Sequence, residues 1–259
     1  MIRRHVIAVL CAGLLFALPK SAAAASIGFF GGNAAGAITA SGNTPVALAN
    51  LTAGDLAGLQ VLWIFNINNG APNATIAGNL AAISAFVAGG GVLSFHDRNV
   101  NQGVSAATYI PGAGGVSFTN LLGSDLTVLV SNGVTNGPAG AIGDTTLDGG
   151  NFSNHGYATQ ASLPAGAVAV LSTGDRTQIV DFYYRFGLGW VYYSAIPLDF
   201  YLAPGGNNPP GDAFRNIYAP NEAAFQASLA GPTVPEPGTV VLLGGGLALL
   251  ATRLRRRRA

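Results

Sequence analysis

The sequence predicts an α/β domain with parallel core strands and a β-hairpin added toward its C-terminal end. Residues 60–65 and 92–95 are nearly continuous apolar runs, as expected for strands that are buried on both faces. A segment of helical period lies between them, so the three form a strand–helix–strand unit whose strands are parallel. Two β-rich runs further along the chain, separated by a turn that contains glycine, predict the hairpin.

The first half of the domain begins with two short apolar strands, at residues 26–30 and 46–48, and a helical turn at 51–59. Asn73 is expected to cap the helix of the central unit, because its side-chain oxygen can accept a hydrogen bond from the first turn. The apolar residues of this helix recur every three or four positions and form one stripe, made of Ile76, Leu80, Ile83 and Val87. Three glycines at 89–91 end the helix, since glycine readily adopts the conformation of a C-cap.

The second half of the domain is less regular. Residues 103–150 are rich in Gly, Asn and Thr and predict one strand only. A helix interrupted at Pro220 is expected near the end of the domain, because proline lacks the N–H that a helix interior requires. The predicted strands are residues 126–130 and 167–171, followed by the hairpin strands 177–184 and 190–196.

Both ends of the chain have the composition of targeting signals. Residues 1–25 combine a basic start, a 13-residue apolar run and small residues suited to cleavage, which predicts a secretory signal peptide. Residues 232–259 combine the motif Val234-Pro235-Glu236-Pro237 with a 14-residue apolar run and an arginine-rich tip. That run is short for a permanent membrane anchor, since a helix needs about 20 residues to cross a bilayer.

The C-terminal segment resembles the PEP-CTERM sorting signal of Gram-negative bacteria, because motif, apolar stretch and basic tip occur in that order. The resemblance implies recognition by an exosortase after transient insertion of the C-terminal helix into the inner membrane. It also implies a location at the cell surface or in the extracellular matrix, since proteins with this signal are associated with exopolysaccharide and biofilm. Residues 26–231 are then the working domain.

Removing both signals changes the charge of the protein. The whole chain has 12 basic and 11 acidic residues. Three of the basic residues lie in the N-terminal signal and five in the tail, which leaves four arginines against ten acidic residues, a net charge of −6. A lysine-free acidic domain is a poor partner for nucleic acid or anionic lipid, both of which bind basic side chains.

The cysteine count excludes several kinds of chemistry. The only cysteine, Cys11, lies in the signal peptide, so the domain has no disulfide, thiolate metal site or cysteine nucleophile. The histidines and carboxylates show no metal-ligand spacing. We therefore predict neither a metal nor a cofactor.

His96, Asp97 and Arg98 form the most unusual group in the domain, and they follow the second strand of the central unit. Ligands of parallel sheets bind outside the carboxyl ends of strands, so this group is a candidate site. With Asp199, which follows a later strand, His96 and Asp97 could perform acid–base catalysis. In the alternative interpretation, Asp97 and Arg98 form a surface ion pair and His96 caps the loop.

Residues 51–66 and 86–98 resemble the core of class I glutamine-amidotransferase-like domains, and the ThuA-like proteins in particular. The resemblance implies a flavodoxin-like three-layer fold and places His96 where the ThuA-like pattern has a histidine. Amidotransferase activity does not carry over, since it needs a Cys–His pair and the domain has no cysteine. The resemblance thus implies a degenerate, non-catalytic domain.

Two functions remain open. The hairpin and its exit are rich in tyrosine and carboxylate, a combination found in sugar-binding sites, although aromatic residues at alternate strand positions also fill sheet cores. The first hypothesis is a surface or matrix protein that binds polysaccharide without catalysis, with Arg98, Tyr193 and Asn66 as binding residues. The second is an extracellular enzyme that acts on a glycan or small sugar through His96 and Asp97.

Overall fold

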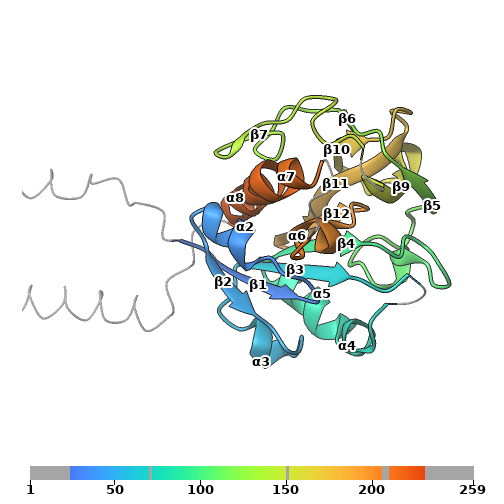
Figure 1. Ribbon diagram of the computed structural model, residues 1–259. Helices are drawn as coiled ribbons and strands as arrows, with labels where there is room; N and C mark the ends of the chain where they lie inside the picture. The colour runs from blue at the N-terminus through green and yellow to red at the C-terminus, as the bar shows by residue number, and fades with distance from the viewer. Residues whose placement is uncertain (1–23, 70–71, 150–151, 206–209, 231–259) are drawn as a thin grey trace, which may run out of the picture.

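A computed structural model of the chain describes residues 24–69, 72–149, 152–205 and 210–230. Their central feature is a parallel sheet (Figure 1). Its five parallel strands lie in the order β2, β1, β3, β4, β12, which is the flavodoxin-like order with β12 in the fifth place. The predicted α/β class is therefore confirmed. The bounds of these strands are β1 Ser26–Phe30, β2 Thr44–Ala47, β3 Val61–Asn66, β4 Val92–Asp97 and β12 Gly189–Ser194.

The predicted hairpin joins this parallel core to an antiparallel extension. β11 (Gln178–Phe186) pairs with β12, and β12 in turn pairs in parallel with β4. The extension continues through β10 (Val168–Ser172) to the two-residue strand β6 (Thr127–Val128), which is shorter than the predicted strand at 126–130. Strand β12 thus belongs to both halves of the sheet.

Two strands of the extension were not predicted. β5 (Phe118–Gly123) and β9 (Asn154–Thr159) pair with each other, and β9 also pairs with β11. Their residues alternate poorly between apolar and polar, and most of β5 is exposed, so neither has the pattern of a buried strand. A separate two-stranded ribbon is formed by β7 (Asn136–Gly137) and β8 (Gly140–Ala141).

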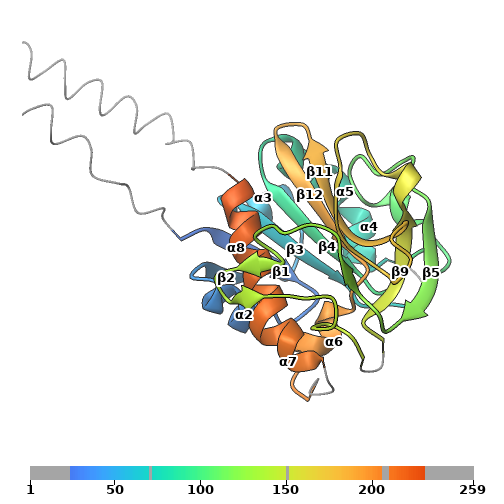
Figure 2. The same ribbon diagram turned by 90° about the horizontal axis from the view of Figure 1, so that it is seen from above.

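Helices cover both faces of the parallel sheet (Figures 1 and 2). On one face lie α2 (Ala35–Ala40) and α8 (Ala219–Leu229), which pack against each other. The opposite face carries α3 (Ala53–Leu56), α4 (Ala74–Gly78) and α5 (Leu80–Ala88). Among the described helices, none is both long and apolar enough to span a membrane.

The helix predicted between β3 and β4 is divided in two. Asn73 caps α4 as predicted, since its side chain accepts a hydrogen bond of 2.8 Å from the Thr75 backbone N–H. At Asn79 the chain leaves the helical conformation, and the Asn79 side chain donates to the Thr75 carbonyl. A side chain that bonds to the backbone in this way competes with the helix. The prediction of a single helix is therefore wrong, because the helix is interrupted at Asn79. The predicted end of the helix at Gly89 is confirmed.

The last part of the domain is helical, as predicted, with its irregularity just before Pro220. The short α7 (Gly211–Ala213) runs into a π-helical turn, η3 (Phe214–Tyr218), and then into α8. Pro220 lies just beyond the π-helical turn, so the irregular hydrogen bonding falls close to the residue that lacks an N–H. The remaining short helices are α6 (Leu198–Leu202), η1 (Ala106–Thr108) and η2 (Gln160–Ser162).

The hairpin turn docks on the C-terminal end of α5, which gives a first prediction. A β-carbon at Gly189 would collide with the backbone carbonyl oxygens of Val87 and Gly91. We expect Gly189→Ala to lower the free energy of unfolding by roughly 1–3 kcal/mol, because the backbone must shift to admit the methyl group. Thermal unfolding measures this loss, and Gly115→Ala is the control, since nothing lies within 4 Å of its added carbon. Equal stability of the two variants would contradict this packing.

Candidate functional site

The carboxyl ends of β3, β4 and β12 meet at one edge of the sheet, where ligands bind in folds of this kind. Asn66 ends β3, Asp97 ends β4, and Asp199 lies in α6 just beyond β12. These are residues that the sequence nominated for a site. The candidate residues, with His96 and Arg98 included, belong to two buried networks and to one group that reaches the surface.

His96 and Asp97 are not brought together. The prediction that the strand ends at Phe95 is wrong, since β4 continues through both residues, with β3 and β12 pairing on either side. Successive side chains of a strand point to opposite faces, so His96 and Asp97 lie on different sides of the sheet. They are only 2% and 0% exposed. Because Asp199 contacts Arg98 instead, the three candidate catalytic residues form no common group.

His96 belongs to a buried network between the sheet and α8. Its Nε2 atom lies 3.3 Å from the Glu222 carboxylate and 3.2 Å from the Ser94 hydroxyl. The same oxygen of Glu222 accepts hydrogen bonds from Ser94 (2.6 Å) and from Gln226 (2.5 Å). The Trp63 indole donates to Gln226, which completes the α8-side network of Trp63, Ser94, His96, Glu222 and Gln226. The network ties the last helix to the centre of the sheet.

Asp181 lies on the same side of the sheet and is fully buried. One of its oxygens accepts hydrogen bonds from the hydroxyls of Tyr218 (2.6 Å) and Tyr192 (3.1 Å). Burial raises the pKa of Asp181 to about 7, and the hydrogen bond from Tyr218 only partly opposes that rise. Asp181 therefore holds its proton over much of the acidic range in the folded protein.

This shifted carboxyl predicts that stability falls as the pH rises from about 4 to about 7. In that window the unfolded chain has released the proton of Asp181 while the folded chain still holds it, so deprotonation favours unfolding. The contribution is at most about 1.4 kcal/mol per pH unit. Denaturant unfolding at several pH values measures the slope, and Asp181→Asn should flatten it. A slope that is unchanged in this variant would show that Asp181 does not carry the effect.

Asp97 is the centre of a second network, on the opposite face of the sheet. It accepts hydrogen bonds from the Asn66 amide (2.9 Å), the Asn99 backbone N–H (3.0 Å), and the hydroxyls of Tyr109 (3.3 Å) and Tyr193 (3.4 Å). Burial raises the pKa of Asp97, although the hydrogen bonds from Asn66, Asn99 and Tyr109 lower it. Asn66 and Tyr193, which the sequence nominated for ligand binding, are buried here and contact Asp97. We call these five residues the Asp97 network.

A third group, the edge cluster, reaches the surface. Arg98 pairs with Asp199 through two contacts, of 2.8 and 3.3 Å, and their side chains are 21% and 15% exposed. The Arg98 guanidinium lies 5.9 Å from the centre of the Phe200 ring, and His155 contacts the Arg98 carbonyl at 3.0 Å. The exposed ring of Phe152 packs edge-on against His155. These five residues combine a paired charge with accessible aromatic surface.

The protonation of the edge cluster follows from its partial burial. Burial raises the pKa of Asp199 despite the opposing charge of Arg98. Burial also lowers the pKa of His155, so its imidazole is neutral at neutral pH. A neutral imidazole beside a paired carboxylate offers hydrogen-bond donors and acceptors with little net charge.

Sequence reasoning missed Glu222 and the central role of Asp181. The sequence contained part of the signal for the network around Glu222. Ser94 and His96 are two residues apart in an apolar strand, so their side chains point to the same face of the sheet. Glu222 and Gln226 are four residues apart and share a helix face. Nothing local joins the two pairs, since Glu222 is 128 positions from Ser94. Within the described parts of the chain, no three histidine or carboxylate side chains converge to hold a metal ion.

Comparisons with known proteins bear on the tail and the fold separately. Residues 233–258 match the PEP-CTERM protein-sorting motif, which confirms the predicted sorting signal; they lie outside the residues that the structure describes, as does most of the predicted signal peptide. A search of curated proteins finds no match.

Among solved structures, the chain is similar to the cytoplasmic protein STM1381 from Salmonella typhimurium LT2, at 12% identity and a TM-score of 0.51, over 79% of this chain and 99% of that one. The cytoplasmic protein STM3548 from Salmonella typhimurium matches at 13% identity and a TM-score of 0.47, over 78% and 98% of the two chains. A β-galactosidase from Rahnella sp. R3 matches at 15% identity and a TM-score of 0.43, over 78% of this chain and 30% of the enzyme.

The likeness to STM1381 shows a shared fold and nothing more, because the identity is low. None of these three structures is named as a ThuA-like protein, so that resemblance stays a prediction. The sorting motif implies that the chain is processed by an exosortase, exported and sorted to the cell surface.

Proposed function

We propose that the chain delivers a non-catalytic binding domain to the cell surface, where it binds extracellular polysaccharide. The sorting motif at residues 233–258 is the observation that carries this proposal, because it directs the domain to the place where polysaccharide is deposited. The domain between the two signals is acidic and lacks lysine, which makes nucleic acid a poor partner.

The geometry of the site favours binding over catalysis. An acid–base catalyst must lie within hydrogen-bond reach of a substrate, and both His96 and Asp97 are buried in networks of their own. The edge cluster, by contrast, is accessible. Its exposed Phe152 ring can stack on the C–H face of a sugar, while Asp199 and His155 offer hydrogen bonds to hydroxyl groups.

The same geometry is consistent with a degenerate amidotransferase-like origin. The strand order is that of flavodoxin-like folds, which the ThuA-like resemblance implies. His96 occupies the matching position, yet it contacts Glu222 and Ser94 inside the protein. We propose that this histidine now stabilises the domain.

The sorting step is tested by changing the motif in whole cells. We expect the double variant Pro235→Ala, Glu236→Ala to accumulate as a longer precursor in the inner membrane, because the exosortase no longer recognises the tail. Pro232→Ala, just outside the matched residues, is the control and should be sorted normally. Immunoblots of membrane and surface fractions measure the ratio. Normal sorting of the double variant would contradict the role of the motif.

The binding step is tested by cosedimentation with exopolysaccharide extracted from the same cells. We expect Arg98→Gln to weaken binding by about tenfold, a loss of roughly 1.4 kcal/mol, because Asp199 and Phe200 lose the group that positions them. The exposed Arg176→Gln removes the same charge elsewhere and should bind normally. If neither the wild-type chain nor Arg176→Gln sediments with the polymer, the binding proposal fails.

A further inference from the structure

A cleft of about 300 Å³ lies on the α2 and α8 side of the molecule, apart from the edge cluster. Three pieces of chain form it: the loop and helix α2 that follow β1, the end of α6, and the π-helical turn η3. The carboxyl end of β1 lies at the switch point of this strand order, where ligands of doubly wound sheets bind. The main lining residues are Asn33, Ala37, Ala40, Leu202, Arg215 and Asn216.

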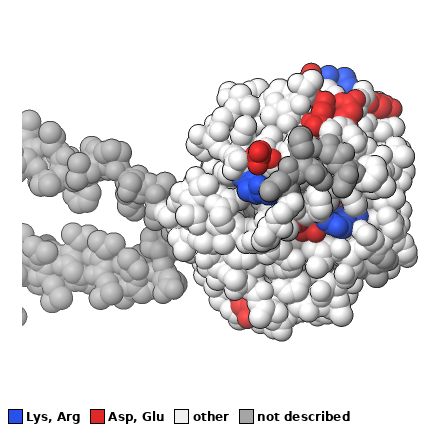
Figure 3. Space-filling view, in the orientation of Figure 1, with Lys and Arg blue, Asp and Glu red and all other residues white. Residues whose placement is uncertain are grey.

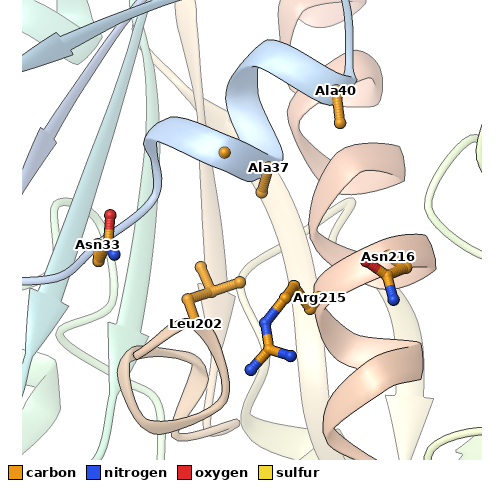
Figure 4. Close-up of a pocket in the computed structure, with 7 residues that line it drawn as sticks. Asn33, Ala37, Ala40, Leu202, Arg215 and Asn216 are labelled. Atoms are coloured by element: carbon orange, nitrogen blue, oxygen red, sulfur yellow. The ribbon is translucent and has the colours of Figure 1, made fainter. Parts of the chain in front are cut away.

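The described lining of the cleft combines small and apolar residues with two asparagines and one arginine. Figure 4 shows Ala37 and Ala40 on α2 pointing toward the space, with Leu202 and Arg215 across from them. Among the described residues that line the cleft, Arg215 is the one that is charged. Charged side chains are sparse on the face that Figure 3 shows, and they occur in small groups of both signs. The positive charge of Arg215 is partly balanced by the Asp212 carboxylate, 3.4 Å away.

Arg215 is held in place by the protein, and a ligand could compete for one of its contacts. Its guanidinium donates to the Tyr201 carbonyl at 2.7 Å, which fixes the side chain along α6. Its contact with Asp212 is longer, at 3.4 Å, and the Asp212 side chain is 84% exposed. A carboxylate inside the cleft could replace Asp212 and form paired hydrogen bonds with the planar guanidinium.

The π-helical turn η3 forms one wall of the cleft. It places the consecutive residues Arg215 and Asn216 on the lining while Phe214 and Tyr218 are buried. Interruptions of this kind occur frequently at functional sites. On the opposite wall the small residues of α2 keep the space open, and a β-carbon at Gly36 would meet nothing within 4 Å.

We propose that this cleft binds the carboxylate-bearing sugar of an acidic polysaccharide, a uronic acid residue. Arg215 binds the carboxylate, the amides of Asn33 and Asn216 bind hydroxyl groups, and Leu202 packs against the C–H face of the ring. The volume is at the lower end for small-molecule sites and suits one sugar residue. The cleft and the edge cluster lie at the two ends of α6, so one polymer could occupy both. The inference rests on the proposed polysaccharide binding and names its substrate class.

The test compares acidic and neutral polymers on the full chain, purified in detergent. Calorimetry with polygalacturonate and with dextran measures the preference, and galacturonic acid and glucose test the single sugars. We expect polygalacturonate to bind about tenfold more tightly than dextran, with Arg215→Gln removing that preference. Ala40→Trp should weaken binding of the acidic polymer by filling the cleft from an exposed position, and Arg176→Gln should leave it unchanged.

Arg215→Gln removes the charge of the cleft, whereas Ala40→Trp fills its space, so a folding defect in one variant does not decide the result. Thermal unfolding of each variant shows whether it is folded. Absence of a preference for the acidic polymer would overturn the inference, as would a preference that survives both Arg215→Gln and Ala40→Trp. If the exopolysaccharide of the cells still binds in either case, only this inference fails. If no polysaccharide binds, the proposed function fails with it.

Discussion

Replacing Glu222 by alanine is expected to lower the free energy of unfolding by about 3–5 kcal/mol, because several buried polar groups lose the partner that they share. Glu222 accepts hydrogen bonds from Ser94 and Gln226 and lies 3.3 Å from His96. Without it, these buried groups lose a shared partner and α8 loses one of its polar links to the sheet, while Gln226 can still bond to Trp63 and Ser94. Denaturant unfolding followed by circular dichroism measures the change.

Two further variants test whether the loss of stability comes from the buried hydrogen bonds of Glu222 or from the removal of a carboxylate in general. Glu222→Gln keeps the shape and one acceptor oxygen, so we expect a smaller loss than in Glu222→Ala. Asp212→Ala removes a carboxylate from the surface and should leave stability within about 0.5 kcal/mol of the wild type. If Glu222→Ala were as stable as Asp212→Ala, the carboxylate could not be buried against His96.

Replacing Asp97 by alanine should destabilise the protein by a similar amount, about 2–4 kcal/mol, because four donors lose one shared acceptor. The group is fully buried, so water cannot take its place without opening the sheet edge. Asp97→Asn retains one acceptor oxygen and should recover part of the loss. A thermal unfolding curve measures both variants.

The two hypotheses for Asp97 differ in what else this variant changes. If Asp97 only holds the sheet edge, its loss lowers stability and leaves polysaccharide binding intact at temperatures where the variant is folded. If Asp97 were part of a catalytic pair with His96, the variant would lose turnover of a substrate with normal stability. Normal stability of Asp97→Ala would therefore contradict the buried network.

The central strands were predictable because their residues are apolar on both faces. β1 and β4 begin where the sequence indicates, β3 begins one residue later, and β3 is buried along its whole length. The end of β4 was not predictable from local composition. His96 and Asp97 have the residue types of a loop, and they remain in the strand because β3 and β12, distant in sequence, supply their backbone partners.

The candidate site was predictable in part for the same reason. The rule that ligands bind at the carboxyl ends of strands placed Arg98 and Asp199 at one edge, and the structure brings them into contact although they are 101 positions apart. Glu222, which contacts His96, and Tyr193, which donates to Asp97, come from segments far along the chain. Such contacts depend on the completed fold, and a single sequence contains no pattern that pairs them.

The most direct test of the central claim measures binding and chain length of the polymer together. Protein recovered from the cell surface is mixed with exopolysaccharide from the same cells, and size-exclusion chromatography with light scattering follows both. We expect saturable binding with no change in polymer length, because His96 and Asp97 are buried and lie on opposite faces of the sheet. A polymer that becomes shorter with time in the presence of the protein would contradict a non-catalytic binding domain.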